Sequence, residues 1–149
     1  MNKVILFFSS AFGTGYIKYA PGTFGSLAGI ILWGLFVPQN YLYHLFFIVS
    51  IFIISLVFSS LAENIYNKKD DQRIVIDEVA GMWVSVAFLP KTLLFMFLGF
   101  MLFRLFDVKK PFFIKKLQKA KGGFGITIDD IVAGVFANII LQVLNLVIK

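Results

Sequence analysis

The stretch "YLYHLFFIVSIFIISLVFSSLA" (residues 41–62) decides the fold, because it is almost entirely apolar and contains no Asp, Glu, Lys or Arg. A helix needs about 20 apolar residues to cross the hydrocarbon core of a bilayer. Residues 131–148 form a second run of nearly the same quality. Both stretches therefore predict membrane-spanning helices.

Three shorter apolar runs cover residues 24–37, 75–89 and 93–106. A 14-residue helix reaches only about 21 Å, against a hydrocarbon core of about 30 Å. Such helices must extend through flanking polar turns or begin below the membrane surface, where protein or a wet cavity surrounds their ends. We therefore expect an all-α, polytopic membrane bundle of four or five spans, some of them short, as a single domain over residues 1–149.

The composition supports a lipid environment. Of the 149 residues, 59% are hydrophobic and only 15% are charged, whereas about a quarter of an ordinary soluble domain is charged. A soluble domain of this size has too little interior to hide so many large apolar side chains. The chain has no cysteine, which excludes disulfides, thiolate metal sites and cysteine nucleophiles. Its N-terminus lacks a convincing cleavage site, so we expect it to be retained.

The basic residues predict the orientation. The net charge of +6 is compatible with nucleic acid or anionic lipid, and the apolar runs favour lipid. Five spans that begin with residues 1–23 inside also place 63–74 and 107–130 inside. These inner segments hold Lys3, Lys18, Lys68, Lys69, Arg73, Lys109, Lys110, Lys115, Lys116, Lys119 and Lys121. The outside keeps only Lys91 and Lys149. The positive-inside rule thus predicts polar loops on the cytoplasmic face of a bacterial inner membrane. Residues 108–121 read as an amphipathic helix on an anionic surface.

The acidic residues point to a site. Three of the eight lie in the polar connector 63–73, where we expect them to be solvated. The other five lie in or beside apolar runs, at Asp77, Glu78, Asp107, Asp129 and Asp130. An acid costs about 2.5–3.5 kcal/mol at the centre of a membrane helix and less near its ends. The predicted topology places all five on the cytoplasmic face, at the depth of lipid phosphate.

Clustered carboxylates beside a phosphate need a divalent cation between them. Mg²⁺ prefers oxygen ligands and commonly binds one or two carboxylates together with substrate phosphate. Taken singly, Asp129 and Asp130 could instead cap a helix, and Arg104 could simply pair with Asp107 three residues later. Because three separate segments converge on one locus, we expect all five acids to bind one or two metal ions and to be catalytic.

Two glycine-rich stretches, residues 20–29 and 121–126, flank this locus. Glycine permits backbone conformations that turn N–H groups towards an anion. The hydroxyls of Thr23 and Ser26 and the charges of Arg104 and Lys110 are further candidates for binding substrate phosphate. Neither stretch is a nucleotide-binding loop.

Elimination narrows the chemistry. Without cysteine there is no cysteine phosphatase. The single histidine, His44, is predicted in or near an outside loop, away from the acids. No D-x-D-x-[TV] motif for an aspartyl-phosphate hydrolase is present. The remaining phosphatase mechanism is metal-assisted attack on the phosphate, with either water or an aspartate as the nucleophile.

Four stretches together resemble the phosphatidylglycerophosphatase A family of bacterial membrane lipid phosphatases. They are "GTGYIKYAPGTFGSLAG" (13–29), "IVIDEVAGMW" (74–83), "FRLFDVKKP" (103–111) and "GGFGITIDDIVAG" (122–134), which reach across nearly the whole chain. The resemblance implies Mg²⁺-dependent hydrolysis of phosphatidylglycerophosphate, a phospholipid substrate in the membrane, to phosphatidylglycerol and phosphate.

Carried over by position, the same five acids correspond to the family's acidic set, and Arg104 and Lys110 to its basic partners. Pro21, Gly22, Thr23, Gly25 and Ser26 correspond to its N-terminal signature. The family often has a second proline shortly after Pro111, where this chain has Phe113. That departure affects the local turn and leaves the acids in place.

Three other functions compete. A non-catalytic membrane scaffold would explain the hydrophobicity but not the acids. A phosphatidyltransferase of phospholipid synthesis also uses clustered aspartates and Mg²⁺, but its D-G-x-x-A-R…G-x-x-x-D-x-x-x-D pattern is absent. An ion transporter would place acids at mid-membrane and on both faces, whereas these are predicted on one.

Overall fold

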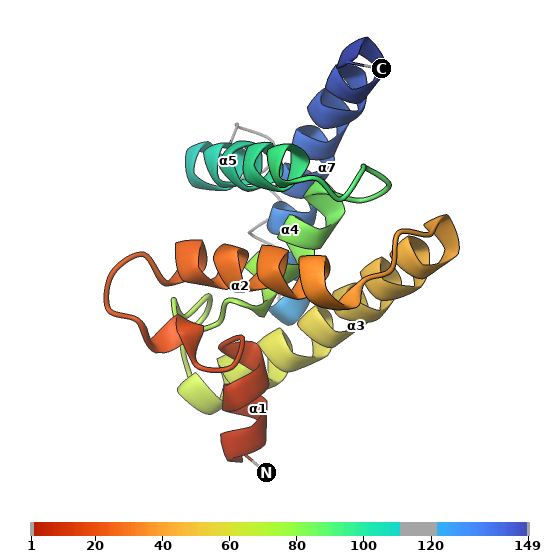
Figure 1. Cartoon of the computed structure of the whole chain (residues 1–149). Coiled ribbons are helices and arrows are strands. Elements are labelled where there is room, and N and C mark those ends of the chain that lie inside the picture. Colours follow the sequence, from red (N-terminus) through yellow and green to blue (C-terminus); the bar gives the residue numbers. More distant parts are fainter. Residues whose placement is uncertain (1, 111–121, 149) are drawn as a thin grey trace.

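The computed structural model describes residues 2–110 and 122–148, and every regular element in those ranges is a helix. This confirms the all-α prediction. The elements, in chain order, are α1 (Asn2–Ser9), the 3₁₀ helix η1 (Thr14–Tyr16), α2 (Pro21–Phe36), α3 (Tyr41–Tyr66), α4 (Ile76–Ser85), α5 (Leu93–Lys109) and α7 (Gly122–Ile148) (Figure 1).

Local sequence explains where three helices begin. Pro21 occupies the first turn of α2, a position where its missing N–H costs nothing. The side chain of Asn40 caps α3 by accepting a hydrogen bond from the Leu42 N–H at 2.9 Å. The Thr92 hydroxyl accepts from the Phe95 N–H at the start of α5. Each cap satisfies a backbone donor that the helix leaves unpaired.

The short helix α4 is the centre of the molecule. It lies between α2 and α5 in Figure 1 and also packs against α3 and α7. Eight of its ten residues are buried. Neighbouring helices approach it closely through small residues: a Cβ added to Gly29 of α2 would meet Val79 and Met82, and one on Gly99 of α5 would meet Val86. Close packing at small residues is the main source of helix association in lipid.

The tightest approach is between α4 and α7. A Cβ on Gly134 would collide with the carbonyl oxygen of Gly81, and a Cβ on Gly81 would lie 2.6 Å from the carbonyl oxygen of Asp130. Further along, the side-chain amide of Asn138 donates to the carbonyls of Ser85 and Ala87. Because these contacts advance along both helices together, α4 and α7 run parallel.

Two hydrogen bonds fix the direction of α3 relative to α7. Ser55 of α3 bonds Thr127 of α7 at 2.8 Å, and Ser60 accepts from the Gly123 N–H, so α3 runs antiparallel to α7. The loops predicted on the outer side also meet, since Gln39 accepts a hydrogen bond from the Lys91 N–H. Which side faces the cytoplasm stays a prediction.

The structure shortens the predicted 75–89 helix to Ile76–Ser85. Val86, Ala87 and Leu89 continue as a buried turn. Gln142 joins Asn138 in donating to the Ala87 carbonyl, so α7 supplies the partners that the end of α4 lacks. A helix too short to cross a bilayer can end inside the molecule only because protein satisfies its free carbonyls.

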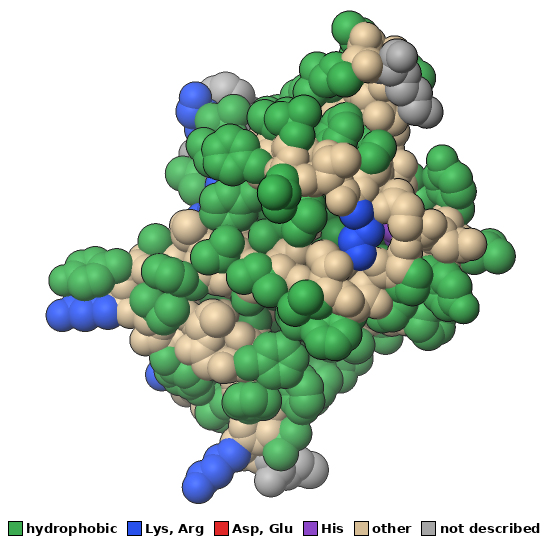
Figure 2. All heavy atoms as spheres, viewed as in Figure 1, with side chains coloured by type: hydrophobic (Ala, Val, Ile, Leu, Met, Phe, Trp, Pro, Cys, Tyr) green, Lys and Arg blue, Asp and Glu red, His purple; other side chains and the backbone are tan. Residues whose placement is uncertain are grey.

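Two of the described helices, α3 and α7, are long and apolar enough to cross a membrane. Figure 2 shows one face covered largely by hydrophobic side chains, with a few Lys and Arg and no Asp or Glu in view. The total of four or five spans stays a prediction, because α2, α4 and α5 are shorter than a bilayer core requires.

The polar connector after α3 is more ordered than the sequence predicts. Asp71 is buried and pairs with Arg73 at 2.7 Å and with Lys68 at 3.3 Å, so the prediction that it is solvated is wrong. Hydrogen bonding to Arg73 lowers the pKa of Asp71 from 3.8 to about 2. This pairing therefore stabilises the fold fully above pH 3.8 and is lost as the pH falls towards 2.

The predicted amphipathic helix over 108–121 falls mostly outside the described residues, as does the Phe113 departure. Of that stretch the structure describes only 108–110, which belong to the end of α5 and its cap.

Gly134→Ala should lower the free energy of unfolding by about 1–3 kcal/mol, because the new Cβ meets the rigid Gly81 backbone. Gly34→Ala is the matched control: its Cβ would meet only the terminal methyl of Met96, which can move. Thermal unfolding in detergent, followed by circular dichroism, compares the two. Equal melting temperatures would show that the α4–α7 crossing is looser than described.

Candidate active site

Three carboxylates from α4 and α7 form the centre of the site. One oxygen each of Asp77, Glu78 and Asp130 lies within 4.8 Å of the others. Asp77 and Asp130 are 6% and 2% exposed. Oδ1 of Asp77 and Oε2 of Glu78 are buried and have no hydrogen-bond partner within residues 2–110 and 122–148. Buried carboxylate oxygens without donors are costly, so this arrangement calls for a positive ligand.

The α4–α7 crossing explains why Asp77 and Asp130 meet. Asp77 lies one turn before Gly81, and Asp130 lies one turn before Gly134. Both belong to the pattern D-x-V-A-G, as "DEVAG" (77–81) and "DIVAG" (130–134). Because the helices run parallel and touch at the two glycines, one turn back along each brings the aspartates to the same level.

A second part of the site surrounds Lys110, the residue that follows α5. Its ammonium lies 2.5 Å from Oδ2 of Asp129, 3.5 Å from Oδ1 of Asp107 and 3.8 Å from Oδ1 of Asp130. Lys110 thereby joins the end of α5 to α7. Oδ1 of Asp129 remains buried and without a partner.

The backbone and the charge of Lys110 both indicate a specialised position. Its φ is 35°, in the left-handed region where helices usually place glycine. A lysine held in such a conformation is the kind of local strain found at functional sites. Burial by itself lowers the pKa of Lys110, but the carboxylates of Asp130 and Asp129 outweigh it and raise the pKa, so the ammonium stays charged.

Arg104 completes the basic pair. It forms a short ion pair with Oδ2 of Asp107, one turn along α5. Its Nη1 also lies near Gly22, the second residue of α2, where an added Cβ would collide with Oε1 of Glu78. The glycine-rich start of α2 therefore reaches the acids directly, and a side chain at Gly22 would have to displace the Glu78 carboxylate.

The two hydroxyl candidates differ in their surroundings. Thr23 follows Gly22 and is partly exposed at the start of α2. Ser26 is fully buried, and its hydroxyl donates to the Gly22 carbonyl at 2.8 Å. The Ser26 hydroxyl is thus committed to the helix backbone. Phosphate binding by either residue stays a prediction.

The alternative that Asp129 and Asp130 cap a helix is wrong. Asp129 and Asp130 are not at the start of their helix, since α7 begins at Gly122 and has no acidic residue in its first turn. They therefore cannot cap it. Asp77 and Glu78 do lie in the first turn of α4, where the helix dipole favours negative charge.

The charge balance fits a bound divalent cation. Five carboxyl groups face two cations, Arg104 and Lys110, so the described site holds more acidic than basic groups. Asp107 is neutralised by these two residues, whereas no ion pair among the described residues reaches Asp77 or Glu78. The oxygen-only donors at Asp77, Glu78 and Asp130 suit a hard ion such as Mg²⁺.

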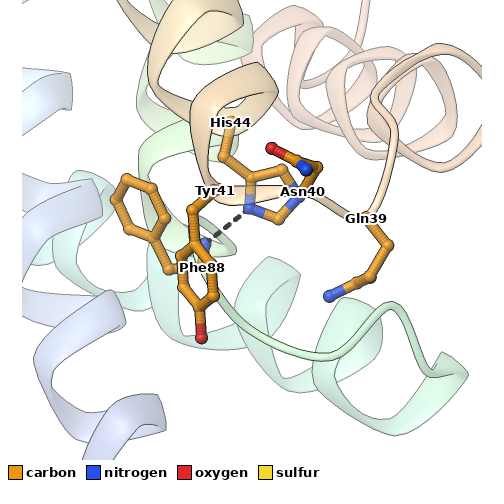
Figure 3. Close-up of a pocket in the computed structure, with 5 residues that line it drawn as sticks. All are labelled: Gln39, Asn40, Tyr41, His44 and Phe88. Carbon is orange, nitrogen blue, oxygen red and sulfur yellow. Dashed lines mark hydrogen bonds between the residues drawn. The ribbon is translucent and has the colours of Figure 1, made fainter.

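His44 lies elsewhere, at the start of α3. It lines a cavity of about 150 Å³ with Gln39, Asn40, Tyr41 and Phe88 (Figure 3). Its Nδ1 accepts a hydrogen bond from the Phe88 N–H at 2.9 Å, which fixes the buried turn after α4. No acid lines this cavity, so the histidine has a structural contact here, consistent with its predicted distance from the acids.

Sequence reasoning missed the residues that set the geometry of the site. Gly81 and Gly134 carry no chemistry, and their importance lies in the helix crossing. The repeated D-x-V-A-G pattern was the available signal, because it places a small residue one helical turn after an acid in both helices.

Comparison with known proteins gives consistent results. The family described as Phosphatidylglycerophosphatase A matches residues 7–145. A phosphatidylglycerophosphatase A from Escherichia coli is 40% identical over 85% of this chain and 74% of its own length. A phosphatidylglycerophosphatase A from Haemophilus influenzae is 35% identical over 87% of this chain and 82% of its own length.

A third relative carries a different name. A Bacteroides thetaiotaomicron protein, named as a candidate phosphatidylinositol-3-phosphatase, is 31% identical over 93% of this chain and 92% of its own length. No solved structure matches the chain.

Lys110→Met should lower the free energy of unfolding by about 1–3 kcal/mol in EDTA, because three buried carboxylates lose their shared cation. Lys109→Met, which removes an exposed charge from the preceding residue, is the matched control and should change stability little. Thermal unfolding of both variants in the same detergent measures the difference. A Lys110→Met protein as stable as Lys109→Met would contradict the ion-pair network.

Proposed function

The chain belongs to the phosphatidylglycerophosphatase A family, and from that premise we propose that it hydrolyses phosphatidylglycerophosphate in a Mg²⁺-dependent reaction. Family membership makes the chain a phosphatase and a membrane protein. The lipid substrate, the metal and the roles of individual residues are the proposal.

One observation carries the proposal. One carboxylate oxygen each of Asp77, Glu78 and Asp130 lies within 4.8 Å of the others. Among the described residues, Oδ1 of Asp77 and Oε2 of Glu78 are buried and accept no hydrogen bond. Such a group has no evident purpose in the packing of the helices, because it destabilises the fold unless a cation is present. These three residues would hold a divalent cation, which would supply positive charge to the oxygens of a substrate phosphate.

The reaction is the hydrolysis of a phosphate monoester. In one route, water attacks the phosphorus while the bond from phosphorus to the glycerol oxygen breaks. In the other, an aspartate oxygen first displaces the glycerol oxygen, and water then attacks the phosphorus while the bond from phosphorus to the aspartate oxygen breaks. The glycerol oxygen takes up a proton, and the products are phosphatidylglycerol and inorganic phosphate. Asp129 would be suited to exchange protons or to attack, because its Oδ1 is free of hydrogen bonds.

The two basic side chains would act by position and charge. Lys110 holds Asp107 and Asp129 in place and keeps its own charge. Arg104 fixes Asp107 and lies beside the start of α2. Both can donate to phosphate oxygens, and a guanidinium does so in a geometry that matches phosphate. Thr23 is placed to add a hydroxyl donor.

We infer that the site faces the cytoplasm from a bacterial inner membrane. The support is the excess of basic residues in the segments that share the acids' side. The parallel direction of α4 and α7 agrees with this arrangement, because both helices begin on the side where the acids lie. An ion transporter would need acids along a path across the membrane. The clustering of these acids on one side does not support that function.

Purified protein in detergent should release phosphate from phosphatidylglycerophosphate with Mg²⁺ and stop in EDTA. Asp77→Asn and Asp130→Asn should each lower kcat by about 100-fold or more, the cost of removing one charge-stabilising group from an active site. Glu63→Gln, an acid of α3 outside the cluster, is the control and should remain active.

A panel of lipid phosphates distinguishes the headgroup. Phosphatidylglycerophosphate should be hydrolysed faster than phosphatidic acid or phosphatidylinositol 3-phosphate. Faster hydrolysis of phosphatidylinositol 3-phosphate would show that the protein is a lipid phosphatase with a different substrate from the one proposed. Full activity of both Asn variants would remove the three-carboxylate group from the active site.

A further inference from the structure

The connector between α3 and α4 carries a second arginine, Arg73, whose guanidinium is fixed on two sides. Its Nε and Nη2 donate to Oδ1 and Oδ2 of Asp71 at 2.7 and 3.1 Å. Its Cζ lies 3.7 Å from the centre of the Tyr66 ring, in a cation–π contact. An arginine held by a carboxylate and an aromatic face is preorganised, so it loses little conformational freedom when it binds a ligand.

The Arg73 guanidinium is fixed but only partly used. It has five N–H groups, and Asp71 accepts from two of them. The remaining three, on Nη1 and Nη2, donate to no residue within 2–110 and 122–148, and the side chain is 40% exposed. Nη1 and Nη2 together form the paired edge that matches two oxygens of a phosphate.

Two further donors lie next to the partners of Arg73. The Lys68 ammonium is 3.3 Å from Asp71, and its side chain is 62% exposed. The hydroxyls of Tyr16 and Tyr66 lie 3.0 Å apart at the surface, so one donates to the other and the second proton can reach an outside acceptor. Residues 68–73 hold three basic and two acidic side chains. This group of donors with an excess of positive charge suits an anion.

The connector borders the acidic site. Arg73 lies four residues before Asp77, so their Cα atoms are at most about 14 Å apart. Asp70, in the same connector, interacts electrostatically with Asp129 of α7. Its φ of 51° places it in the left-handed region, which is uncommon for an aspartate and shows that its surroundings fix the backbone there.

A second segment joins Arg73 to the acids. A Cβ added to Gly15 of η1 would collide with the Arg73 carbonyl oxygen, and one added to Gly22 of α2 would collide with Oε1 of Glu78. Residues 15–22 therefore touch the connector at one end and the acidic site at the other. A ligand that reaches from the acids along this segment meets the free edge of a fixed arginine.

We propose that Arg73, with Lys68 beside it, binds the phosphodiester of the phospholipid substrate while the acids and their cation bind the terminal phosphate. The inference rests on the proposed function. Phosphatidylglycerophosphate carries two phosphates joined by a three-carbon glycerol, namely the terminal monoester that is hydrolysed and the phosphodiester that leads to the acyl chains. Phosphatidic acid carries a monoester alone. Arg73 is thus a specificity-determining residue, which favours the lipid with two phosphates.

The position of Arg73 favours the substrate over surrounding lipid. Any phospholipid of the leaflet offers the same phosphodiester, but only the substrate ties it to a monoester within reach of the acids. The two sources are separated by assays in an uncharged detergent without added phospholipid, where the substrate supplies the only phosphodiester.

Arg73→Gln tests the proposal with two lipids that have the same acyl chains, dihexanoyl phosphatidylglycerophosphate and dihexanoyl phosphatidic acid. We expect KM for phosphatidylglycerophosphate to rise by about tenfold with kcat retained, the size of a lost hydrogen bond to a charged group. KM for phosphatidic acid, or its inhibition constant if it is not hydrolysed, should stay near the wild-type value. Lys3→Gln removes an exposed charge from α1 and is the control, which should match the wild type with both lipids.

The comparison of two lipids separates recognition from a structural role. Loss of the Asp71 pair disturbs the connector whatever the substrate, so a structural role would change both lipids alike. Equal shifts for the two lipids, or kinetics of Arg73→Gln that match Lys3→Gln, would overturn the proposal. If Arg73→Gln does not fold, Arg73→Lys takes its place, because it keeps a charge beside Asp71 and lacks the paired edge. It should raise KM for phosphatidylglycerophosphate several-fold and leave the value for phosphatidic acid unchanged.

A binding measurement separates this proposal from the proposed function. If the wild type hydrolyses no phosphatidylglycerophosphate, the function fails, and Arg73 is tested alone with dihexanoyl phosphatidylglycerol, which keeps the phosphodiester and lacks the terminal phosphate. In a phosphorus NMR titration with EDTA present, the wild type and Lys3→Gln should bind this lipid about tenfold more tightly than Arg73→Gln. Equal binding by the three proteins would overturn recognition of the phosphodiester by Arg73.

Discussion

The close crossing of α4 and α7 is the constraint on which the rest of the structure depends. Gly81 and Gly134 let the two backbones approach so closely that neither position can accept a Cβ without movement. The helices are parallel there, and each carries an aspartate one turn earlier. Asp77 and Asp130 are therefore brought together by backbone packing and not by attraction, since two carboxylates repel each other.

Because packing brings the acids together, the site lowers the stability of the fold and yet has a fixed geometry. Asp77, Asp107, Asp129 and Asp130 are all at least nine-tenths buried. Arg104 and Lys110 neutralise the part of the cluster nearest α5, and among the described residues Oδ1 of Asp77 and Oε2 of Glu78 have no donor. Packing energy from the small-residue contacts around α4 holds these oxygens in place. A cation and a substrate phosphate, if they bind here as we propose, would meet a preformed arrangement, which would reduce the ordering that catalysis requires.

Much of this arrangement could be predicted from the sequence. The apolar runs predict the helices, and the acids flanking them predict a cluster, because alternating helices return 77–78, 107 and 129–130 to one end. The start of α7 could not be predicted, because the glycine-rich residues 122–125 look like a loop in the sequence. In the structure they are helical, and Gly123 packs closely against Leu56 and donates a hydrogen bond to Ser60 of α3. The burial of Asp71 was also hidden, because it depends on its pairing with Arg73 and Lys68 in space. Ser26 shows the converse case. The sequence predicts that its hydroxyl could bind phosphate, whereas in the structure it donates a hydrogen bond to the Gly22 carbonyl of its own helix.

The most direct test of the central claim is Mn²⁺ binding, measured by electron paramagnetic resonance on the purified protein in detergent without substrate. We expect the wild type and Glu63→Gln to bind the ion in competition with Mg²⁺, and Asp77→Asn and Asp130→Asn to bind it at least about tenfold more weakly. Equal binding by all four proteins would show that the oxygens gathered at the α4–α7 crossing do not hold a divalent cation.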